Sequence, residues 1–323
     1  YGSLNTTKHD PLLKRILYWL RLNLIVPDMR IGWNPSAYKL AKQEVLSGNY
    51  DRIITTGPPH STHLIGLMLK RRYKIKWITD FRDPMSQIYY LKLNPPLPIT
   101  MKLHKHLERK IIRNADLNVI VSHSISTALP EGKKAVLYNG YAADDFDNLV
   151  YTRADHFRIK FVGQLTAGQN PQPLLEALTE LEVFPEIKFY AIGTNSFPGT
   201  SANIVRLPYL PHQKALQELV NAELLILFIN DFEGSEGMLT TKLFEYIASR
   251  TPILCLAKPG GEAESIINRT HSGIVGQSKK QVLDTISQHY LAWQSGDYSR
   301  CEGNISFLSS DEQARELLSL LSD

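Results

Sequence analysis

A lysine and a glutamate three positions apart, Lys242 and Glu245, have the residue types and spacing to bind a nucleotide. In a helix they would be neighbours on one surface. Near a helix N-terminus, free N–H groups and a partial positive charge favour phosphate, and Lys242 would add charge there. Glu245, one turn further on, would accept hydrogen bonds from two ribose hydroxyls, because an ionised carboxylate only accepts. The alternative is a solvent-exposed ion pair worth about 0.2–0.5 kcal/mol.

The surrounding segment predicts the elements that would position this pair. Leu224–Ile229 is an uninterrupted apolar run, which is typical of a strand buried on both faces of a parallel sheet. A polar loop follows over residues 230–238, then a helical pattern over residues 240–249, and Ile253–Leu256 is the next apolar strand. This order is a βαβ unit, and such units bind ligands at the carboxyl ends of their strands.

A second phosphate-binding feature is predicted at Gly163. The strand Ile159–Val162 ends at this glycine, and a helix is expected from Pro171. A glycine at a strand-to-helix turn lets the backbone approach a phosphate closely. We therefore expect Gly163 and Lys242 to share the diphosphate.

Histidines open a helix in the first half of the chain. A predicted strand over residues 51–56 is followed by the turn 57–59, and then by His60 and His63. Neutral histidine at a helix start can exchange a hydrogen bond with a substrate hydroxyl. The alternative is that Ser61 or Thr62 caps the helix and the histidines are exposed to solvent.

Three charged residues, Asp80, Arg82 and Asp83, follow the short apolar strand Trp77–Thr79. Charges at a strand end are costly unless they face a cleft or pair with one another. Either aspartate could contact an acceptor hydroxyl, and the forked guanidinium of Arg82 suits a phosphate. Arg82 could instead satisfy the two aspartates internally.

Composition bounds the class of protein. The chain has 323 residues, 43% hydrophobic and 21% charged, as expected for a globular protein of about two domains. Two cysteines argue against a disulfide framework, and no Cys/His cluster has the spacing of a metal site. We find no apolar run of about 18 residues that would predict a membrane-spanning helix.

Charge divides the sequence into a basic and an acidic half. Residues 1–150 hold 22 Lys and Arg against 12 Asp and Glu, and residues 151–323 hold 14 against 20. A basic half suits nucleic acid or an anionic membrane, and without a nucleic-acid-binding motif we expect the membrane. A helix starting at Asp10-Pro11 and ending at Pro27 is apolar on most sides. It is predicted to be either packed into the core or lying on a membrane surface.

Several segments resemble one enzyme family. KLFEYIASRTPILCLA (residues 242–257), TGPPHSTHLIGL (56–67), WITDFRDP (77–84) and LYNGYAADDF (137–146) look like GT-B glycosyltransferases, specifically the retaining enzymes of glycosyltransferase family 4. The resemblance implies that Glu245 holds the donor ribose. The earlier glutamate of the family motif would fall at Gly237, with Glu236 adjacent, so Glu236 or the Gly237 N–H is expected near the donor sugar. Gln164 stands where the family often has arginine, which leaves more of the diphosphate charge to Lys242.

The resemblance implies an α/β fold with two Rossmann-like domains. We expect an acceptor-side domain over residues 1–150, incomplete because its opening strands are missing, a nucleotide-sugar domain over 151–305, and a terminal helix over 306–323 that returns to the first domain. The implied function is transfer of a sugar, with retention, from a nucleotide-diphosphate sugar to a saccharide or lipid-linked hydroxyl. No metal or cofactor is expected.

The acceptor side of the predicted site is Asp80, Arg82, Asp83 and His60. The expected location is the cytoplasm, at the inner face of the membrane, and no nucleic acid is expected as a partner. Two alternatives stay open: a sugar-nucleotide epimerase of the same fold, and a subunit that binds a nucleotide without catalysis.

Overall fold

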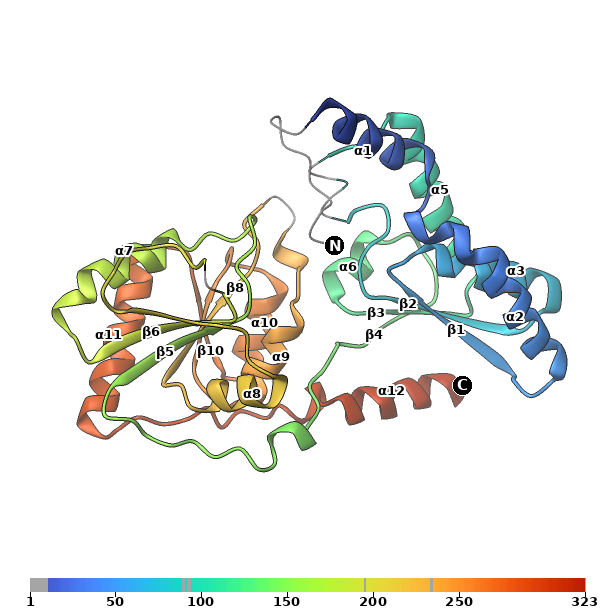
Figure 1. The fold of residues 1–323 in the computed structure, drawn as a ribbon. Coiled ribbons are helices and arrows are strands. Elements are labelled where there is room, and N and C mark those ends of the chain that lie inside the picture. The colour runs from blue at the N-terminus through green and yellow to red at the C-terminus, as the bar shows by residue number, and fades with distance from the viewer. Residues whose placement is uncertain (1–10, 89–90, 92–93, 195, 233–234, 323) are drawn as a thin grey trace. The chain divides into compact units, whose positions relative to one another are not determined.

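The computed structural model describes residues 11–88, 91, 94–194, 196–232 and 235–322. The chain divides after Leu137 into two compact units, and each contains its own parallel sheet (Figure 1). This is the α/β architecture predicted from the sequence.

The sheet of the first unit has four strands in the order β1–β2–β3–β4. They are β1 (Arg52–Gly57), β2 (Lys76–Phe81), β3 (Leu117–Ile120) and β4 (Lys134–Val136), all parallel. The helices of this unit are α1 (Leu12–Leu24), η1 (Met29–Trp33, a 3-10 helix), α2 (Asn34–Ser47), α3 (Ser61–Tyr73), α5 (Pro98–Asn114) and α6 (His123–Ala128).

The core of the first unit is built around Trp77 of β2, whose side chain is fully buried. The indole ring fits against α3 because residue 66 is glycine, since a Cβ built there would overlap the ring. The indole N–H donates to the Thr55 hydroxyl (2.9 Å), which joins β2 to β1. Ile111 and Ile112 of α5 complete this cluster.

The sheet of the second unit has six parallel strands in the order β10–β9–β8–β5–β6–β7. They are β5 (Phe157–Val162), β6 (Ile187–Ile192), β7 (Ile204–Leu207), β8 (Leu224–Phe228), β9 (Ile253–Leu256) and β10 (Gly273–Gly276). The helices are α7 (Gln172–Glu180), α8 (His212–Val220), α9 (Thr241–Ala248), α10 (Glu262–Arg269), α11 (Lys279–Ser295) and α12 (Ser310–Ser322). Short 3-10 helices lie at Asp144–Phe146, Leu181–Val183, Ser235–Gly237 (η4) and Ser306–Leu308.

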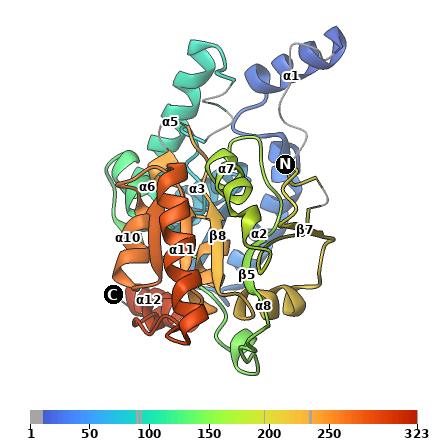
Figure 2. The same cartoon turned by 90° about the vertical axis from the view of Figure 1, so that its left-hand side faces the viewer.

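Both faces of strand β8 are covered by helices, which is why its sequence is apolar at every position. Leu224, Ile226 and Phe228 pack with α7 and α11 on one face of the sheet. Leu225 and Leu227 pack with α8, α9 and α10 on the other face. Side chains alternate between the faces of a strand, so burial of both faces requires a continuous apolar run. The helix layers can be followed in Figure 1 and Figure 2.

Residues 138–149 join the core of the second unit. Tyr138, Tyr141, Phe146 and Leu149 pack against the cluster formed by α8, α9 and α10. The two units therefore separate earlier in the chain than residue 150, where the sequence placed the boundary.

Two local predictions differ from the structure. Strand β2 continues through Phe81, so Asp80 lies inside the strand and pairs in register with Thr56. The core-packed interpretation of α1 is wrong, because Asn23 is its only buried residue.

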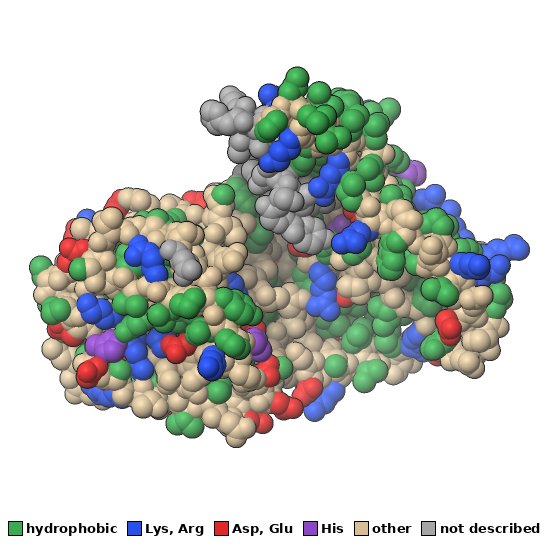
Figure 3. Space-filling model, viewed as in Figure 1, with side chains coloured by type: hydrophobic (Ala, Val, Ile, Leu, Met, Phe, Trp, Pro, Cys, Tyr) green, Lys and Arg blue, Asp and Glu red, His purple; other side chains and the backbone are tan. Residues whose placement is uncertain are grey.

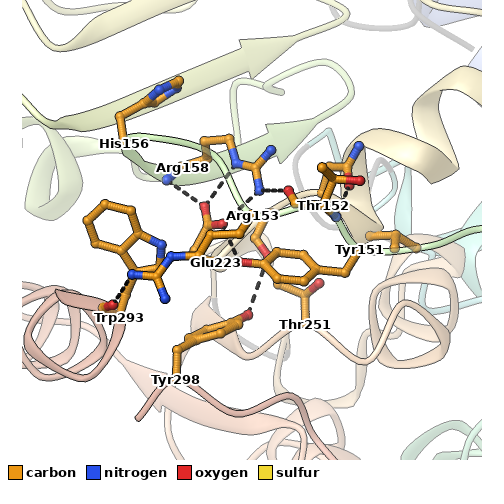
Figure 4. A network of polar contacts seen from close by, with 12 residues as sticks. Tyr151, Thr152, Arg153, His156, Arg158, Glu223, Thr251, Trp293 and Tyr298 are labelled. Atoms are coloured by element: carbon orange, nitrogen blue, oxygen red, sulfur yellow. Dashed lines mark hydrogen bonds and ion pairs between the residues drawn. The ribbon is translucent and has the colours of Figure 1, made fainter. Parts of the chain in front are cut away.

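A buried ion pair fixes the amino-terminal edge of the second sheet (Figure 4). The fully buried carboxylate of Glu223, just before β8, accepts from the backbone N–H of Arg158 (2.7 Å) and from its Nε (3.0 Å) and Nη2 (2.7 Å). The Tyr151 hydroxyl donates to the same carboxylate (2.8 Å). These bonds connect β8 to β5 at the edge opposite their carboxyl ends.

Candidate functional site

Gly163 and Lys242, far apart in sequence, meet at the carboxyl end of β5. The backbone of Gly163 has φ +127°, and a Cβ built there would overlap the Lys242 ammonium. A Cβ built on Gly193, which follows β6, would lie 3.5 Å from the Gly163 Cα. The prediction that Gly163 and Lys242 lie together is consistent with this geometry, and only glycine leaves room for the ammonium.

The first turn of α9 is fixed against the end of β5. The Thr240 hydroxyl accepts from the Lys242 N–H (3.4 Å) and caps the helix. The Val162 N–H donates to the Tyr246 hydroxyl (2.9 Å). The Lys242 ammonium lies 5.2 Å from the centre of the Phe161 ring, within the range of a cation–π contact.

The two charged groups of α9 are half-buried and remain open to a ligand. Desolvation lowers the pKa of Lys242 and raises the pKa of Glu245. Within the described ranges, no carboxylate oxygen lies within 4.0 Å of the Lys242 ammonium, and the Glu245 carboxylate has no hydrogen-bond donor. Half-buried charges without an ion-pair or hydrogen-bond partner are costly in an isolated protein, which is typical of a site that a charged ligand completes.

Polar residues near Glu245 were not identified from the sequence. Besides the desolvation that raises the pKa of Glu245, electrostatic interaction with His212 lowers this pKa and interaction with Asp145 raises it. Asp145 accepts from Gln213 Nε2 (3.0 Å), and its other oxygen lies 3.4 Å from His212 Nε2. Asp145 comes from the segment that the sequence placed in the first domain, so only the packing of residues 138–149 could reveal it.

Glu236 and Gly237 lie in η4, in the loop between β8 and α9. The Glu236 carboxylate is 3.9 Å from the ammonium of Lys258, which also lies 3.7 Å from Asp231. A Cβ on Gly261 would come within 2.9 Å of the Glu236 carbonyl oxygen, so the two loops pack closely. Lys258 is a cation that the sequence reasoning missed, partly neutralised by these two carboxylates.

The loops after β5 and β8 are tied together. The Asp231 N–H donates to the Gly168 carbonyl (2.7 Å), and Gln169 Nε2 donates to the Phe228 carbonyl (2.8 Å). The Thr166 hydroxyl donates to the Asn230 side chain (3.1 Å). These bonds hold the loop that follows Gly163 against the loop that leads to α9, and such preorganisation lowers the cost of binding a ligand.

In the first unit, His60 and His63 are buried, so the solvent-exposed alternative for them is wrong. His60 is 3% exposed and His63 is fully buried, and His63 stacks on Phe81 with ring centres 4.6 Å apart. A Cβ on Gly57 would lie 2.6 Å from His63 Nε2 and 2.7 Å from His60 Nδ1. Burial lowers the pKa of His60 to about 4 and holds that of His63 well below its usual value. Both imidazoles are therefore neutral at pH 7.

The N-terminus of α3 is already occupied by a carboxylate. Asp28 accepts from the Ser61 N–H (2.7 Å) and from the Ser61 hydroxyl (2.9 Å). Asn34 Nδ2 donates to the Ser61 carbonyl (2.8 Å). A carboxylate at this position is stabilised by the free N–H groups of the helix. Asp28 lies 33 residues before Ser61, so no local pattern could predict the contact.

The three charged residues near the end of β2 separate into a pair and a single group. Arg82 Nε donates to Asp80 Oδ2 at 2.8 Å, which confirms internal pairing for one of the two aspartates. Asp80 is buried, whereas Asp83 reaches solvent. Desolvation raises the pKa of the Asp83 carboxyl to about 6, although part of the side chain is exposed.

Glu108 of α5 holds the segment that follows Asp83. Its buried carboxylate accepts from the Met85 N–H (3.1 Å), the Ser86 N–H (2.9 Å) and the Ser86 hydroxyl (2.6 Å). The turn carrying Asp83 is therefore held by three hydrogen bonds. The helical position of Glu108 gave no hint of this role.

A cavity of about 220 Å³ lies beside the carboxyl ends of β8, β9 and β10, and none of the predicted site residues lines it. Its walls are Asn170, Pro173, Ile229, Asp231, Leu256, Ala257, Gly276 and Gln277. Across the described part of the chain, no three His, Cys, Asp or Glu residues are grouped so that they could hold a metal ion. In the same residues, no helix is both long enough and apolar enough to span a membrane.

Each unit is a parallel sheet with helical crossovers, and together they are the two Rossmann-like domains of the GT-B fold. No protein-family model and no curated protein matches the chain. Among solved structures, sucrose-phosphate synthase from Thermosynechococcus elongatus aligns with a TM-score of 0.66 and 12% identity, covering 91% of this chain and 78% of that one.

Two further structures show the same fold. A glycosyltransferase from Rickettsia africae has a TM-score of 0.62 and 14% identity, covering 98% of this chain and 82% of its own. HepE from Anabaena, in complex with UDP, has a TM-score of 0.62 and 12% identity, and the alignment covers 90% of this chain and 81% of HepE. The GT-B fold predicted from the sequence is thereby confirmed.

Proposed function

We propose that this protein is a glycosyltransferase that moves a sugar from a nucleotide-diphosphate donor to a hydroxyl acceptor. The observation that carries the proposal is the position of Lys242 against Gly163, at the carboxyl end of β5 and the first turn of α9. A diphosphate at that point would meet an ammonium, a backbone free of a side chain and the amide groups of a helix start. The glycosyltransferases that share the fold, one of them bound to UDP, support the same assignment.

Glu245 would bind the donor ribose. Its carboxylate lies one turn beyond Lys242 and has no donor among the described residues. Two vicinal hydroxyls would supply the missing hydrogen bonds, and the ligand would offset the desolvation that raises the pKa of Glu245. Glu236 and the Gly237 N–H would lie on the sugar side.

The proposed reaction proceeds with retention of the anomeric configuration and without a metal cofactor. The chemistry asked of the protein is positioning of the acceptor hydroxyl and stabilisation of the leaving diphosphate. Lys242 and the α9 amides would supply that stabilisation. Asp83 would belong to the acceptor side. Asp80 and Arg82 lie beside it, and His60 packs behind Gly57. The acceptor would be a saccharide or a lipid-linked hydroxyl.

Calorimetric titration with UDP, GDP and ADP tests the donor site, with Glu245→Ala as the variant. We expect one nucleotide to bind and its affinity to fall about tenfold or more in the variant, because at least one hydrogen bond to a charged group is lost. Glu312→Ala is the matched control, since Glu312 pairs with Arg315 in an exposed ion pair on α12. If none of the three nucleotides binds, the assignment of Lys242 and Glu245 is wrong.

Product analysis then separates the enzymatic alternatives. Conversion of a sugar nucleotide in the absence of any acceptor would favour an epimerase. Tight binding with no turnover on any saccharide or lipid-linked acceptor would favour a non-catalytic subunit. For a transferase, the anomeric coupling of the product in proton NMR, compared with that of the donor, tests retention, and unchanged rates in EDTA test the absence of a metal.

A further inference from the structure

We propose that α1, η1 and the start of α5 form a docking surface for an anionic phospholipid membrane. Seven of the 13 residues of α1 are large apolar side chains that are 37–70% exposed. They are Leu12, Leu13, Ile16, Leu17, Trp19, Leu20 and Leu24. Figure 3 shows hydrophobic side chains gathered over this helix with Lys and Arg beside them. Large contiguous apolar patches on a soluble protein mark interaction sites.

The surface has a defined shape because the end of α1 is anchored to α5. The Leu97 N–H donates to the Asn23 side-chain oxygen (2.6 Å), and the Thr100 hydroxyl donates to the Asn23 carbonyl (3.2 Å). This contact places the exposed residues Leu97, Ile99 and Leu103 beside the end of α1. Ile99 is the most exposed of the three, at 75%.

A groove of about 460 Å³ runs along α1 and reaches η1. Its walls combine apolar and basic side chains: Lys14, Leu17, Tyr18, Leu20, Arg21, Leu24, Ile25 and Met29. Met29 and Trp33 extend the exposed apolar surface over η1, at 50% and 48% exposed. A surface with apolar side chains beside cationic ones has the composition of helices that lie in the headgroup region of a bilayer.

The charge on this surface selects the occupant. Residues 11–33, which contain α1 and η1, carry four basic side chains, Lys14, Arg15, Arg21 and Arg30, against the single acidic residue Asp28. Asp28 is engaged at the N-terminus of α3. The first two turns of α5 add Lys102 and Lys105, and the single acidic residue of that helix, Glu108, is buried and hydrogen-bonded. A second copy of the same cationic face would be repelled, whereas anionic headgroups would be attracted.

The geometry favours contact with the membrane surface. A 13-residue helix is about 20 Å long, shorter than a hydrocarbon core of about 30 Å. The apolar side chains would enter the boundary between headgroups and acyl chains, with the basic side chains reaching phosphate groups. This surface contains none of the candidate donor-site residues, so the inference is independent of the proposed function.

Tryptophan fluorescence on vesicles gives a direct test. The chain has four tryptophans; Trp77 and Trp293 are buried, and Trp19 and Trp33 are about half exposed. We expect a blue shift and co-flotation with vesicles of phosphatidylcholine and phosphatidylglycerol, both weakened by salt. Neutral phosphatidylcholine vesicles should bind about tenfold less.

Two variants locate the contact. Leu13→Glu/Leu17→Glu should weaken binding to the anionic vesicles by about tenfold or more, because it replaces inserted apolar area with negative charge. Leu318→Glu is the matched control, since Leu318 is equally exposed (64%) but lies on α12, and it should bind as the parent does. Circular dichroism and urea titration would confirm that both variants are folded.

Three results would overturn the proposal. They are equal binding to neutral and anionic vesicles, undiminished binding by the α1 variant, and no binding to either vesicle. If size-exclusion chromatography finds a concentration-dependent dimer that Leu13→Glu/Leu17→Glu abolishes, the occupant is a second copy of the chain.

Discussion

Replacing Gly163 with alanine should displace Lys242 and weaken nucleotide binding. At φ +127° an alanine is strained, at a cost of about 1–3 kcal/mol in the free energy of unfolding. The new methyl group would also overlap the Lys242 ammonium, which would have to move. A hydrogen bond to a charged group contributes about 1.5–3 kcal/mol, so its loss should raise the Kd about 10- to 150-fold.

The assay is calorimetric titration with the nucleoside diphosphate that binds the parent protein, with UDP as the first probe. Gly296→Ala is the matched control, because Gly296 also has a positive φ, +87°, but a Cβ there meets nothing within 4 Å. This control should lose about 1–2 kcal/mol of stability and keep the parental Kd.

A double-mutant cycle isolates the contact. Lys242→Met should weaken binding by the same factor as Gly163→Ala, and the double variant should bind no worse than Lys242→Met alone, since residues in contact do not act additively. A Gly163→Ala protein that binds within threefold of the parent would refute the reasoning. So would a double variant whose losses add, because Gly163 would then act independently of Lys242.

Three further predictions concern stability. Glu223→Ala leaves the Arg158 guanidinium buried without its carboxylate and should lower the free energy of unfolding by about 3–5 kcal/mol in urea titrations; a loss below about 1 kcal/mol would contradict the network. Gly57→Ala should cost about 1–3 kcal/mol in the same assay, because its methyl group would press on the imidazoles of His60 and His63; an unchanged midpoint would contradict this packing. The His60 pKa falls from 6.5 to about 4 on folding. The contribution of neutral His60 to the free energy of unfolding is therefore fully present above pH 6.5, and about 3 kcal/mol of it is lost as the pH falls towards 4. His60→Leu should reduce this acid dependence in unfolding titrations between pH 7 and 4, and an equal slope in both proteins would show that other groups cause it.

Local sequence determined most of the secondary structure. The short apolar run that begins at Leu224 favoured a strand covered on both faces, and the helical pattern after it placed Lys242 and Glu245 one turn apart. Gly163 was identified because a glycine at a strand-to-helix turn lets the backbone approach a phosphate closely. Such features depend on neighbouring residues, and hydrophobic periodicity and turn chemistry are sufficient to predict them.

Contacts between distant segments were decided by tertiary structure. Only packing of β5 against α9 brings Gly163 to the Lys242 ammonium, and only the return of η1 to α3 lets Asp28 occupy a helix N-terminus. The pattern of α1 fitted a core helix as well as a surface helix, because an apolar sequence does not specify what covers it. Burial is a property of the assembled units, so the sequence could name the apolar side chains, and the three-dimensional arrangement decided which of them meet water.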